Sequence, residues 1–540
     1  MTAIIVSPAA AEQSQVNPSK PELFFGLVGA AGTDLAAVQE SLEQVLRGVG
    51  YMPEPLKLSE LLADANPGFK VSANEDERIQ CLMKLGDDFR ETTIKRADAI
   101  ALLAVAAVRQ KRDEKNGSPQ HVMNGTAFIF NSLKHPEEVS RFRRLYGESF
   151  FLIGAYCPAD QRVTNLTKRI AKSHRSMEEG RFKTAAKTII ETDQKRSGTN
   201  FGQDVRGTFP LSDVFVSDKD GGREQIRRFV ELLFGNPFIT PGVDEQGMFH
   251  AKAAALRSSD LSRQVGALIA TRRGEFISAG CNEVPAAGGG SVWEGDAVDD
   301  RDFRHGRDAN AVMKHEIIAE VFDVLKQNNW ISDDVSSFDP KKFADLALDG
   351  DKGNLNLKDT RIASLIEFGR IVHAEMSAIT EAARRGIPVK GETLYCTTFP
   401  CHMCARHIIS SGISRVVYIE PYPKSMTKEL YKKAVRVEGD KHAASNAVDF
   451  EPFLGISPSI YFKLFAMPDR KDKKGYAINW IATNSTPRFV NKSAQYIPVE
   501  EGLLEYLDVQ KQNQKNALTG ETNEQSNVAQ HTTREGEAGI

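Results

Sequence analysis

The chain has 540 residues, which is more than one hydrophobic core supports, so about two to four domains are expected. Hydrophobic residues make up 41% and charged residues 26%, the balance of a soluble globular protein, and the net charge of -3 gives no overall attraction to nucleic acid. Six cysteines in so long a chain exclude a disulfide framework. The sequence shows neither a signal peptide nor a long apolar run, so we expect a cytoplasmic protein with no membrane partner.

The N-terminal half alternates apolar runs with amphipathic segments. After a flexible leader over 1–20, the run 23–28 predicts a buried strand, and a helix pattern follows over about 35–46. Further apolar runs are separated by polar helical stretches such as 137–146. Strands that alternate with helices indicate an α/β domain with a parallel sheet, which we place at 21–240.

A second α/β domain is predicted over 249–509. It begins with two alternating strand patterns around a turn and contains a long charged insertion over 291–370. The insertion carries one clear amphipathic helix, near 311–327. The last segment, 510–540, is polar and poor in aromatic residues, so we expect it to be disordered.

Three potential zinc ligands lie in the second domain, together with one carboxylate that is not needed as a ligand. Cys401 and Cys404 are three positions apart on the predicted first turn of a helix, so both thiolates share one face. His373 begins another helix, and Glu375 follows two residues later. Three protein ligands leave the fourth position of zinc open to water, which is typical of a catalytic site. H-x-E with P-C-x-x-C is the pattern of zinc-dependent nucleobase deaminases, with Glu375 as the proton carrier.

Each part of this pattern has a simpler interpretation. A lone C-x-x-C also occurs in redox pairs and in structural zinc sites. His407 lies three residues past Cys404, so a closed structural site with His407 as fourth ligand is the main alternative, although it leaves Glu375 without a role. Cys396 lies inside a predicted strand and is most simply a small buried hydrophobe.

Further segments of the second domain fit the pattern of a single family. They are His373-Ala374-Glu375-Met376, Thr393-Leu394-Tyr395, Pro400-Cys401-x-x-Cys404, Ser262-Arg263-Gln264-Val265-Gly266-Ala267 and Gly280-Cys281-Asn282-x-x-Pro285. The domain resembles the deoxycytidylate deaminases of the cytidine deaminase superfamily. The resemblance implies an α/β/α sandwich with a mixed five-stranded sheet, one zinc ion per chain, and Asn282 as a hydrogen-bonding partner of the substrate's sugar hydroxyl. Ser377 stands where many of these enzymes have Asn, and the insertion over 291–370 is long, so the phosphate specificity does not carry over.

A glycine-rich loop follows the first predicted strand, in the context of a phosphate-binding loop. A standard loop of this kind has Lys and then Ser or Thr after its last glycine, whereas this chain has Thr and Asp. Degenerate nucleotide binding and plain strand-to-helix packing are therefore equally supported by the loop itself. The candidate binding residues are Gly26, Gly29, Gly32, Thr33 and Asp34.

The two-domain layout resembles the bacterial anti-phage deoxycytidine nucleotide deaminases, in which a P-loop kinase-like domain precedes the deaminase domain. The run over 131–138 fits that arrangement. The resemblance implies hydrolytic deamination of dCTP or dCMP to the deoxyuridine nucleotide, which depletes dCTP during infection. It also implies a regulatory nucleotide or inhibitor at the N-terminal domain, and we expect a homo-oligomer.

Three other functions remain open. A polynucleotide cytosine or adenine deaminase would use the same zinc chemistry. The overall charge disfavours a nucleic-acid substrate, but the basic stretch over 161–187 keeps that function open, although such a stretch is more often a solvated helical face. The second alternative is a housekeeping dCMP deaminase in dTTP synthesis. The third is a nucleotide sensor with a structural zinc.

Overall fold

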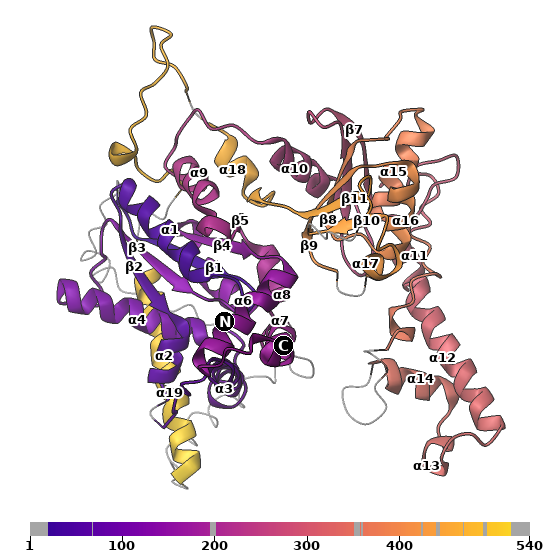
Figure 1. The fold of residues 1–540 in the computed structure, drawn as a ribbon, viewed down its shortest axis with the longest axis horizontal. Coiled ribbons are helices and arrows are strands. Elements are labelled where there is room, and N and C mark those ends of the chain that lie inside the picture. Colours follow the sequence, from indigo (N-terminus) through magenta and orange to yellow (C-terminus); the bar gives the residue numbers. More distant parts are fainter. Residues whose placement is uncertain are drawn as a thin grey trace, which may run out of the picture. The chain divides into compact units, whose positions relative to one another are not determined.

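The computed structural model describes residues 20–66, 68–194, 201–349, 357, 360–422, 425–438, 443–467, 469–489 and 494–519 (Figure 1). The chain folds into two compact units. The first comprises Met1–Ser212, Val216–Pro237 and Met467–Ile540, and the second comprises Asp213–Phe215 and Phe238–Ala466.

These boundaries differ from those expected from the sequence at the C-terminal side. We placed the second domain at 249–509, whereas the chain returns to the first unit at Met467. The predicted leader over 1–20 lies outside the described residues, apart from its last position. The predicted tail begins inside a helix that runs to Thr519, and its remainder also lies outside the described residues.

The first unit is an α/β structure, as predicted. Strands β2, β3, β1, β4 and β5 lie in that order in the sheet, and the pairs β2–β3, β3–β1 and β1–β4 are parallel. Its strands are β1 (Leu23–Val28), β2 (Met52–Lys57), β3 (Thr126–Asn131), β4 (Phe150–Tyr156) and β5 (Val214–Ser217). Its helices are α1 (Leu35–Gly48), α2 (Leu58–Asp64), α3 (Glu75–Asp88), α4 (Ala99–Asn116), α5 (Pro136–Tyr146), α6 (Ala159–Ser173), α7 (Lys183–Gln194), α8 (Val205–Thr208), α9 (Arg223–Leu233) and α19 (Tyr496–Thr519).

Local sequence explains where these elements begin. Every residue of β1 is buried, which is typical of a central parallel strand covered on both faces. Asp34 caps α1, because its Oδ1 accepts a hydrogen bond of 3.1 Å from the amide of Ala37. His135 caps α5 in the same way through its Nδ1, and Glu138 completes the capping box, so this histidine has a structural role.

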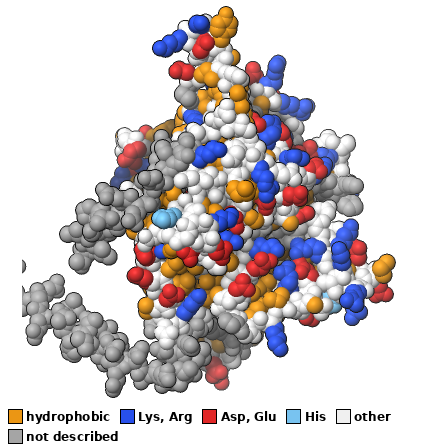
Figure 2. Space-filling model, turned by 90° about the vertical axis from the view of Figure 1, so that its left-hand side faces the viewer, with side chains coloured by type: hydrophobic (Ala, Val, Ile, Leu, Met, Phe, Trp, Pro, Cys, Tyr) orange, Lys and Arg blue, Asp and Glu red, His pale blue; other side chains and the backbone are white. Residues whose placement is uncertain are grey.

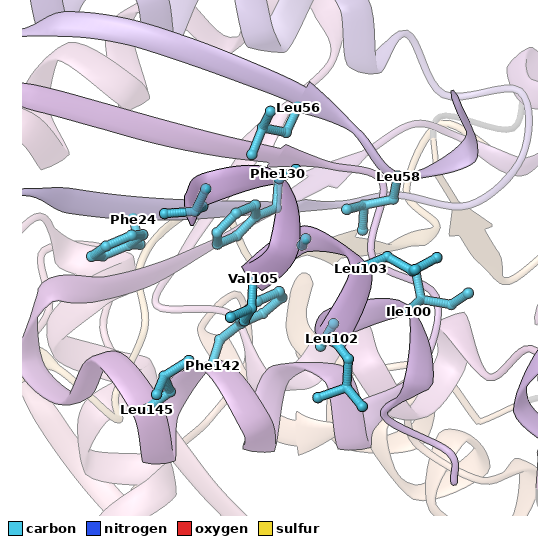
Figure 3. Packing of buried hydrophobic residues seen from close by; sticks show 14 of the residues in the cluster. Phe24, Leu56, Leu58, Ile100, Leu102, Leu103, Val105, Phe130, Phe142 and Leu145 are labelled. Atoms are coloured by element: carbon cyan, nitrogen blue, oxygen red, sulfur yellow. The ribbon is translucent and has the colours of Figure 1, made fainter. Parts of the chain in front are cut away.

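The core of the first unit lies between the sheet and helices α4 and α5 (Figure 3). Phe24 and Phe130 extend from the strands, and Phe142 extends from α5 toward them. The rings of Phe130 and Phe142 stack with their centroids 4.4 Å apart, and Phe24 stacks on Tyr146 at 3.6 Å. Aromatic pairs of this kind stabilise a core beyond their buried area.

Helix α19 comes from the far end of the chain and packs on α4 and α5 (Figure 1). The wholly buried Arg112 of α4 is bound by two wholly buried carboxylates, those of Glu22 and Glu500. Glu22 also accepts a hydrogen bond of 2.8 Å from Tyr496 Oη. Because a buried charge must be paired, these contacts fix α19 to the first unit.

The second unit is also α/β, with a mixed sheet ordered β10-β11-β9-β8-β6-β7. It therefore has six strands where five were expected. Strand β6 is antiparallel to β7 and β8, and the others are parallel. The strands of this sheet are β6 (Gly266–Ala270), β7 (Phe276–Cys281), β8 (Thr393–Thr398), β9 (Arg415–Glu420), β10 (Val435–Val437) and β11 (Val448–Pro452). The two-residue strand β12 (Gly455–Ile456) lies outside it and pairs antiparallel with β5. Its helices are α10 (Val243–Ala255), α11 (Asp302–His305), α12 (Ala309–Gln327), α13 (Asp333–Ser336), α14 (Pro340–Asp349), α15 (Ala374–Arg384), α16 (His402–Ser411), α17 (Thr427–Leu430) and α18 (Tyr461–Phe465).

Two glycines let helices approach this sheet at backbone distance. A Cβ on Gly266 would lie 2.0 Å from the carbonyl oxygen of Ala251, and one on Gly280 would lie 2.4 Å from that of Ala374. Any larger residue would push α10 or α15 away. The helix expected in the insertion is confirmed as α12. In the part of the chain that is described, no helix combines the length and apolarity needed to cross a bilayer.

Candidate metal centre

Two helix starts bring three potential metal ligands together in the second unit. His373 is the N-cap of α15 and Cys401 is the N-cap of α16, which carries Cys404 in its first turn. His373 Nδ1 lies 3.4 Å from Cys401 Sγ and 3.4 Å from Cys404 Sγ. All three ligand atoms lie within 4.8 Å of one another. The sequence-predicted ligands are therefore neighbours in the fold, although the two helices are distant in sequence.

The spacing fits a tetrahedral zinc ion. Zinc binds histidine nitrogen at about 2.1 Å and thiolate sulfur at about 2.3 Å, so two such ligands at a tetrahedral angle are about 3.6 Å apart. The observed separations of 3.4 Å between nitrogen and sulfur are close to that value. Two cysteines and one histidine are also a donor set that zinc prefers.

The electrostatics of the cluster favour a thiolate. A hydrogen bond from Cys404 lowers the pKa of Cys401 to about 4, and His373 adds to this effect. The same hydrogen bond and burial raise the pKa of Cys404. The hydrogen bond with Cys401 raises the pKa of His373 to about 9. A metal ion here would displace the protons of Cys404 and His373, as metal sites do on loading.

Glu375 lies beside the three ligands without being one of them. It belongs to the first turn of α15 and is only 4% exposed. Burial raises its pKa, and the negative charge of Cys401 raises it further. A carboxyl group that holds a proton more tightly than usual, next to an open metal position, is suited to carrying a proton between water and a substrate.

His407, the alternative fourth ligand, is not part of the cluster. Among the described residues, only His373, Cys401 and Cys404 form a group of metal-binding side chains at this spacing, and His407 is not a member. His407 is half-buried on α16, whereas Cys401 and Cys404 are buried. This geometry disfavours a closed structural site, because the described part of the chain supplies no fourth ligand to the cluster.

Asn282 lies near the cluster, but its amide is already engaged. The backbone next to it pairs with the residue before the histidine ligand, because Glu283 and Val372 exchange backbone hydrogen bonds of 3.3 and 3.0 Å. Asn282 Oδ1 accepts from the amide of Val265 at 2.7 Å. Its Nδ2 donates to Asp260 Oδ2 at 2.9 Å and to the carbonyl oxygen of Arg263 at 2.8 Å. These contacts hold the loop over 260–265, a positioning role that sequence analysis missed.

Sequence reasoning also missed several neighbours of the cluster. The guanidinium of Arg263 lies 5.2 Å from the ring centroid of Tyr422, and burial and the charge of Cys401 raise the pKa of Tyr422. Arg370, three residues before the histidine ligand, pairs with Asp302 at 3.0 Å. Arg263 belongs to a segment that the family resemblance includes, whereas no local motif marks Tyr422, Asp302 or Arg370, because they come from segments far apart in the chain.

The glycine-rich loop of the first unit joins β1 to α1. Gly26 lies inside β1, where a Cβ would meet Leu133 Cδ1 at 2.6 Å, so it is a strand residue with a packing role. Gly29, Gly32 and Thr33 form the connection, and Asp34 begins the helix. Gly32 has a φ of +92°, and a Cβ there would meet the carbonyl oxygen of Arg162 at 2.4 Å.

A family model matches part of the second unit. Residues 241–420 match the family described as the cytidine and deoxycytidylate deaminase zinc-binding region. The deoxycytidylate deaminase of Enterobacteria phage T2 is 48% identical over 54 residues, 10% of this chain and 29% of that protein. The ComE operon protein 2 of Bacillus subtilis (strain 168) is 39% identical over 66 residues, 12% of this chain and 35% of that protein. The chain thus spans about a third of the length of these relatives.

Solved structures give weaker matches. The crystal structure of dCMP deaminase from the cyanophage S-TIM5 in apo form has a TM-score of 0.21 and 15% sequence identity. It aligns with 40% of this chain and 100% of its own.

Proposed function

We propose that the second unit catalyses the zinc-dependent hydrolytic deamination of deoxycytidine nucleotides, dCTP or dCMP, to the deoxyuridine nucleotides. One observation carries this proposal. Three clustered ligands, His373, Cys401 and Cys404, lie beside a buried carboxyl group, Glu375, within the segment that matches a deaminase zinc-binding region. A structural zinc site would need a fourth protein ligand and would have no use for that carboxyl group.

The residues divide the chemistry between them. His373, Cys401 and Cys404 would hold one zinc ion per chain. A bound zinc lowers the pKa of a coordinated water to about 7 and so supplies a nucleophile at neutral pH. Glu375 would accept one proton from this water and pass it to the pyrimidine ring nitrogen, and would then carry the second proton to the amino group, which leaves as ammonia. Its burial keeps bulk water away from the proton transfer.

The substrate class rests on the relatives and on the loop near Asn282. Several relatives, from phages T2 and T4 and from yeast, are named as deoxycytidylate deaminases. Asn282 adjoins Glu283, which pairs with Val372 just before His373, so Asn282 and the loop that it holds lie next to the segment that leads into the candidate metal centre. We therefore extend to Asn282 the role of orienting the substrate's sugar, either directly or through this loop.

The wider role that we propose is anti-phage defence by depletion of dCTP, in a cytoplasmic homo-oligomer. The first unit would bind a regulatory nucleotide or inhibitor through its loop between β1 and α1. Two observations support a nucleotide-binding ancestry: the strand order β2-β3-β1-β4-β5, in which β2, β3, β1 and β4 are parallel, and the glycine loop that follows the central strand. The loop lacks the lysine of a standard P-loop, which favours regulation over phosphoryl transfer. A housekeeping dCMP deaminase remains the simpler biological alternative.

A polynucleotide substrate is the second candidate function. Binding of a single strand requires a continuous basic groove lined with aromatic side chains. On the face shown in Figure 2, lysine and arginine side chains are interspersed with acidic ones. The basic residues of the stretch over 161–187 are partly neutralised as well, because Arg169 pairs with Glu75 and His174 lies 2.7 Å from Asp76. These features favour a free nucleotide.

A substrate panel tests the proposal. The zinc-loaded full-length protein is incubated with deoxycytidine, dCMP, dCTP and single-stranded DNA, with and without ATP or GTP, and ammonia release is measured. We expect turnover of dCMP or dCTP and none of single-stranded DNA. Turnover of DNA without any turnover of free nucleotide would contradict the proposal and favour the second candidate.

A further inference from the structure

In the structure, carboxylate groups of this chain bind the backbone of the loop between β1 and α1. The amide of Ala31 donates a hydrogen bond of 2.6 Å to Oδ2 of Asp193, a residue distant in sequence. Asp193 is wholly buried. At the next turn, the amide of Asp34 donates to Asp218 Oδ2 at 3.2 Å. In strand–loop–helix nucleotide sites, backbone amides at these positions donate hydrogen bonds to the phosphate. In this chain the amides of Ala31 and Asp34 donate to carboxylates of the same chain instead.

A lysine completes the arrangement. Lys134 Nζ lies 2.8 Å from Asp193 Oδ1 and donates a hydrogen bond of 3.3 Å to the carbonyl oxygen of Gly29. Lys134 follows strand β3, so it reaches the loop from the neighbouring strand of the sheet. The cation that the loop itself lacks is therefore supplied by another element, and Asp193 is bound to it.

The position of Asp193 is unfavourable for its own helix. It is the second-last residue of α7, and a negative charge near a helix C-terminus is opposed by the helix dipole. Burial of an unpaired carboxylate also costs free energy. The contacts with Ala31 and Lys134 offset both costs, so Asp193 is stable there only while it binds the loop.

A second feature of the loop is an available hydroxyl group. The hydroxyl of Thr33, which is 7% exposed, has no hydrogen-bond partner among the described residues. Buried polar groups almost always have a partner, so this hydroxyl is available to a water molecule or to a bound phosphate. The methyl group of Thr33 packs over Gly29, at 3.2 Å from the position of a Cβ there.

We propose that Asp193 is an internal substitute for a bound phosphate, and that it keeps this loop closed until the phosphate chain of a nucleotide displaces it. This inference rests on the nucleotide-binding role proposed for the first unit. A polyphosphate offers the same acceptors as the carboxylate, to the same amide and the same lysine, and can reach Thr33 in addition. Displacement would release the end of α7, which gives the first unit two states with different affinities for the ligand.

The test compares binding of inorganic tripolyphosphate to full-length, zinc-loaded variants by titration calorimetry. Asp193→Asn keeps an acceptor for Ala31 but frees Lys134, and we expect its affinity to exceed that of the wild type at least about tenfold, the scale of one hydrogen bond to a charged group. Glu191→Gln is the matched control, because it removes a charge from the exposed side of the same helix. Adding Lys134→Met to Asp193→Asn should abolish the gain.

Two results would overturn the inference: equal affinity of the wild type and Asp193→Asn, or no binding by either. Thermal melting verifies that each variant folds, and Asp193→Ser replaces Asp193→Asn if the latter does not. The readout is independent of deamination. If the zinc-loaded wild type deaminated no nucleotide but Asp193→Asn still bound tripolyphosphate more tightly, the proposed deaminase activity would be contradicted. The inference about Asp193 would still stand.

Discussion

Asp260 and Asn282 are side chains near the candidate metal centre that hold the backbone around them in place. The amide of Asn282 makes three hydrogen bonds, and Asp260 accepts one of them and also bonds to Ser262. Removing a buried partner leaves the others unsatisfied, which costs about 1–3 kcal/mol per group. Asn282 is therefore a main support of the loop over 260–265.

Asn282→Ala should lower kcat/KM for dCMP or dCTP at least about tenfold while zinc content stays unchanged, because the loop loses its support and the ligands do not. Steady-state kinetics and metal analysis measure the two effects. Thr380→Ala, on the exposed side of α15, serves as a control with normal kinetics. Unchanged kcat/KM in Asn282→Ala would remove this residue from the site.

Metal retention depends on the two cysteines. The double variant Cys401→Ala, Cys404→Ala should lose nearly all zinc, because a single histidine remains from a three-ligand set. Elemental analysis after dialysis measures this. Cys81→Ala is the control, since Cys81 is exposed and lies outside the cluster. Full zinc content in the double variant would show that the metal binds elsewhere.

At the scale of elements, one carboxylate joins the start of α4 to the middle of α5. Asp98 binds Arg96 through two hydrogen bonds of 2.8 Å and Arg141 through one of 2.6 Å. Burial acts to raise the pKa of Asp98, but the hydrogen bonds from Arg96 and Arg141 lower it overall. A depressed carboxylate pKa contributes stability above the unfolded pKa, and this stability is lost as pH falls through the folded value.

Asp98→Asn should therefore lower the melting temperature at pH 7, with a cost of about 1.5–3 kcal/mol for the charged hydrogen bonds. The difference from wild type should persist down to about pH 4 and narrow at lower pH, as the wild-type carboxylate is protonated as well. Melting curves from pH 7 to pH 3 measure this. A difference that does not change with pH would exclude a charge effect.

Periodicity and capping signals predicted the elements well, because these signals are local. The buried run of β1, Asp34 at the start of α1 and the helix of the insertion all lie where the sequence places them. The resemblance implied five strands for the second sheet, and neither β10 nor β11 was placed from the sequence; β10 has only three residues and no clear alternation. The cluster of His373, Cys401 and Cys404 could be predicted from residue types, whereas the contact of Asp193 could not, because its partner is 162 positions away.

At the scale of the whole molecule, the C-terminal segment belongs to the first unit. Sequence analysis assigned 467–509 to the second domain, because nothing in the chain marks a return to an earlier core. The return is visible only through long-range pairs such as that of Arg112 with Glu500. Fragments cut at a single point near residue 240 would therefore divide the first unit.

Truncation after Ala466 should strongly destabilise the first unit, because Arg112 loses one of its two buried carboxylates and Tyr496 no longer covers the core. Breaking a buried ion pair costs about 3–5 kcal/mol, so we expect a lower melting temperature or insoluble protein. Truncation after Thr519 keeps all of α19 and is the matched control. Equal melting temperatures for the two truncated proteins would contradict the assignment of this segment.

The central claim is that a zinc-bound site with Glu375 as its proton carrier deaminates deoxycytidine nucleotides. The most direct measurement is ammonia release from dCMP and dCTP by wild type and Glu375→Gln at equal zinc content. We predict that the variant keeps one zinc per chain and loses at least about a hundredfold in kcat, since general acid–base catalysis contributes roughly that much or more. Normal turnover by Glu375→Gln, or no turnover of either nucleotide by the zinc-loaded wild type, would contradict the claim.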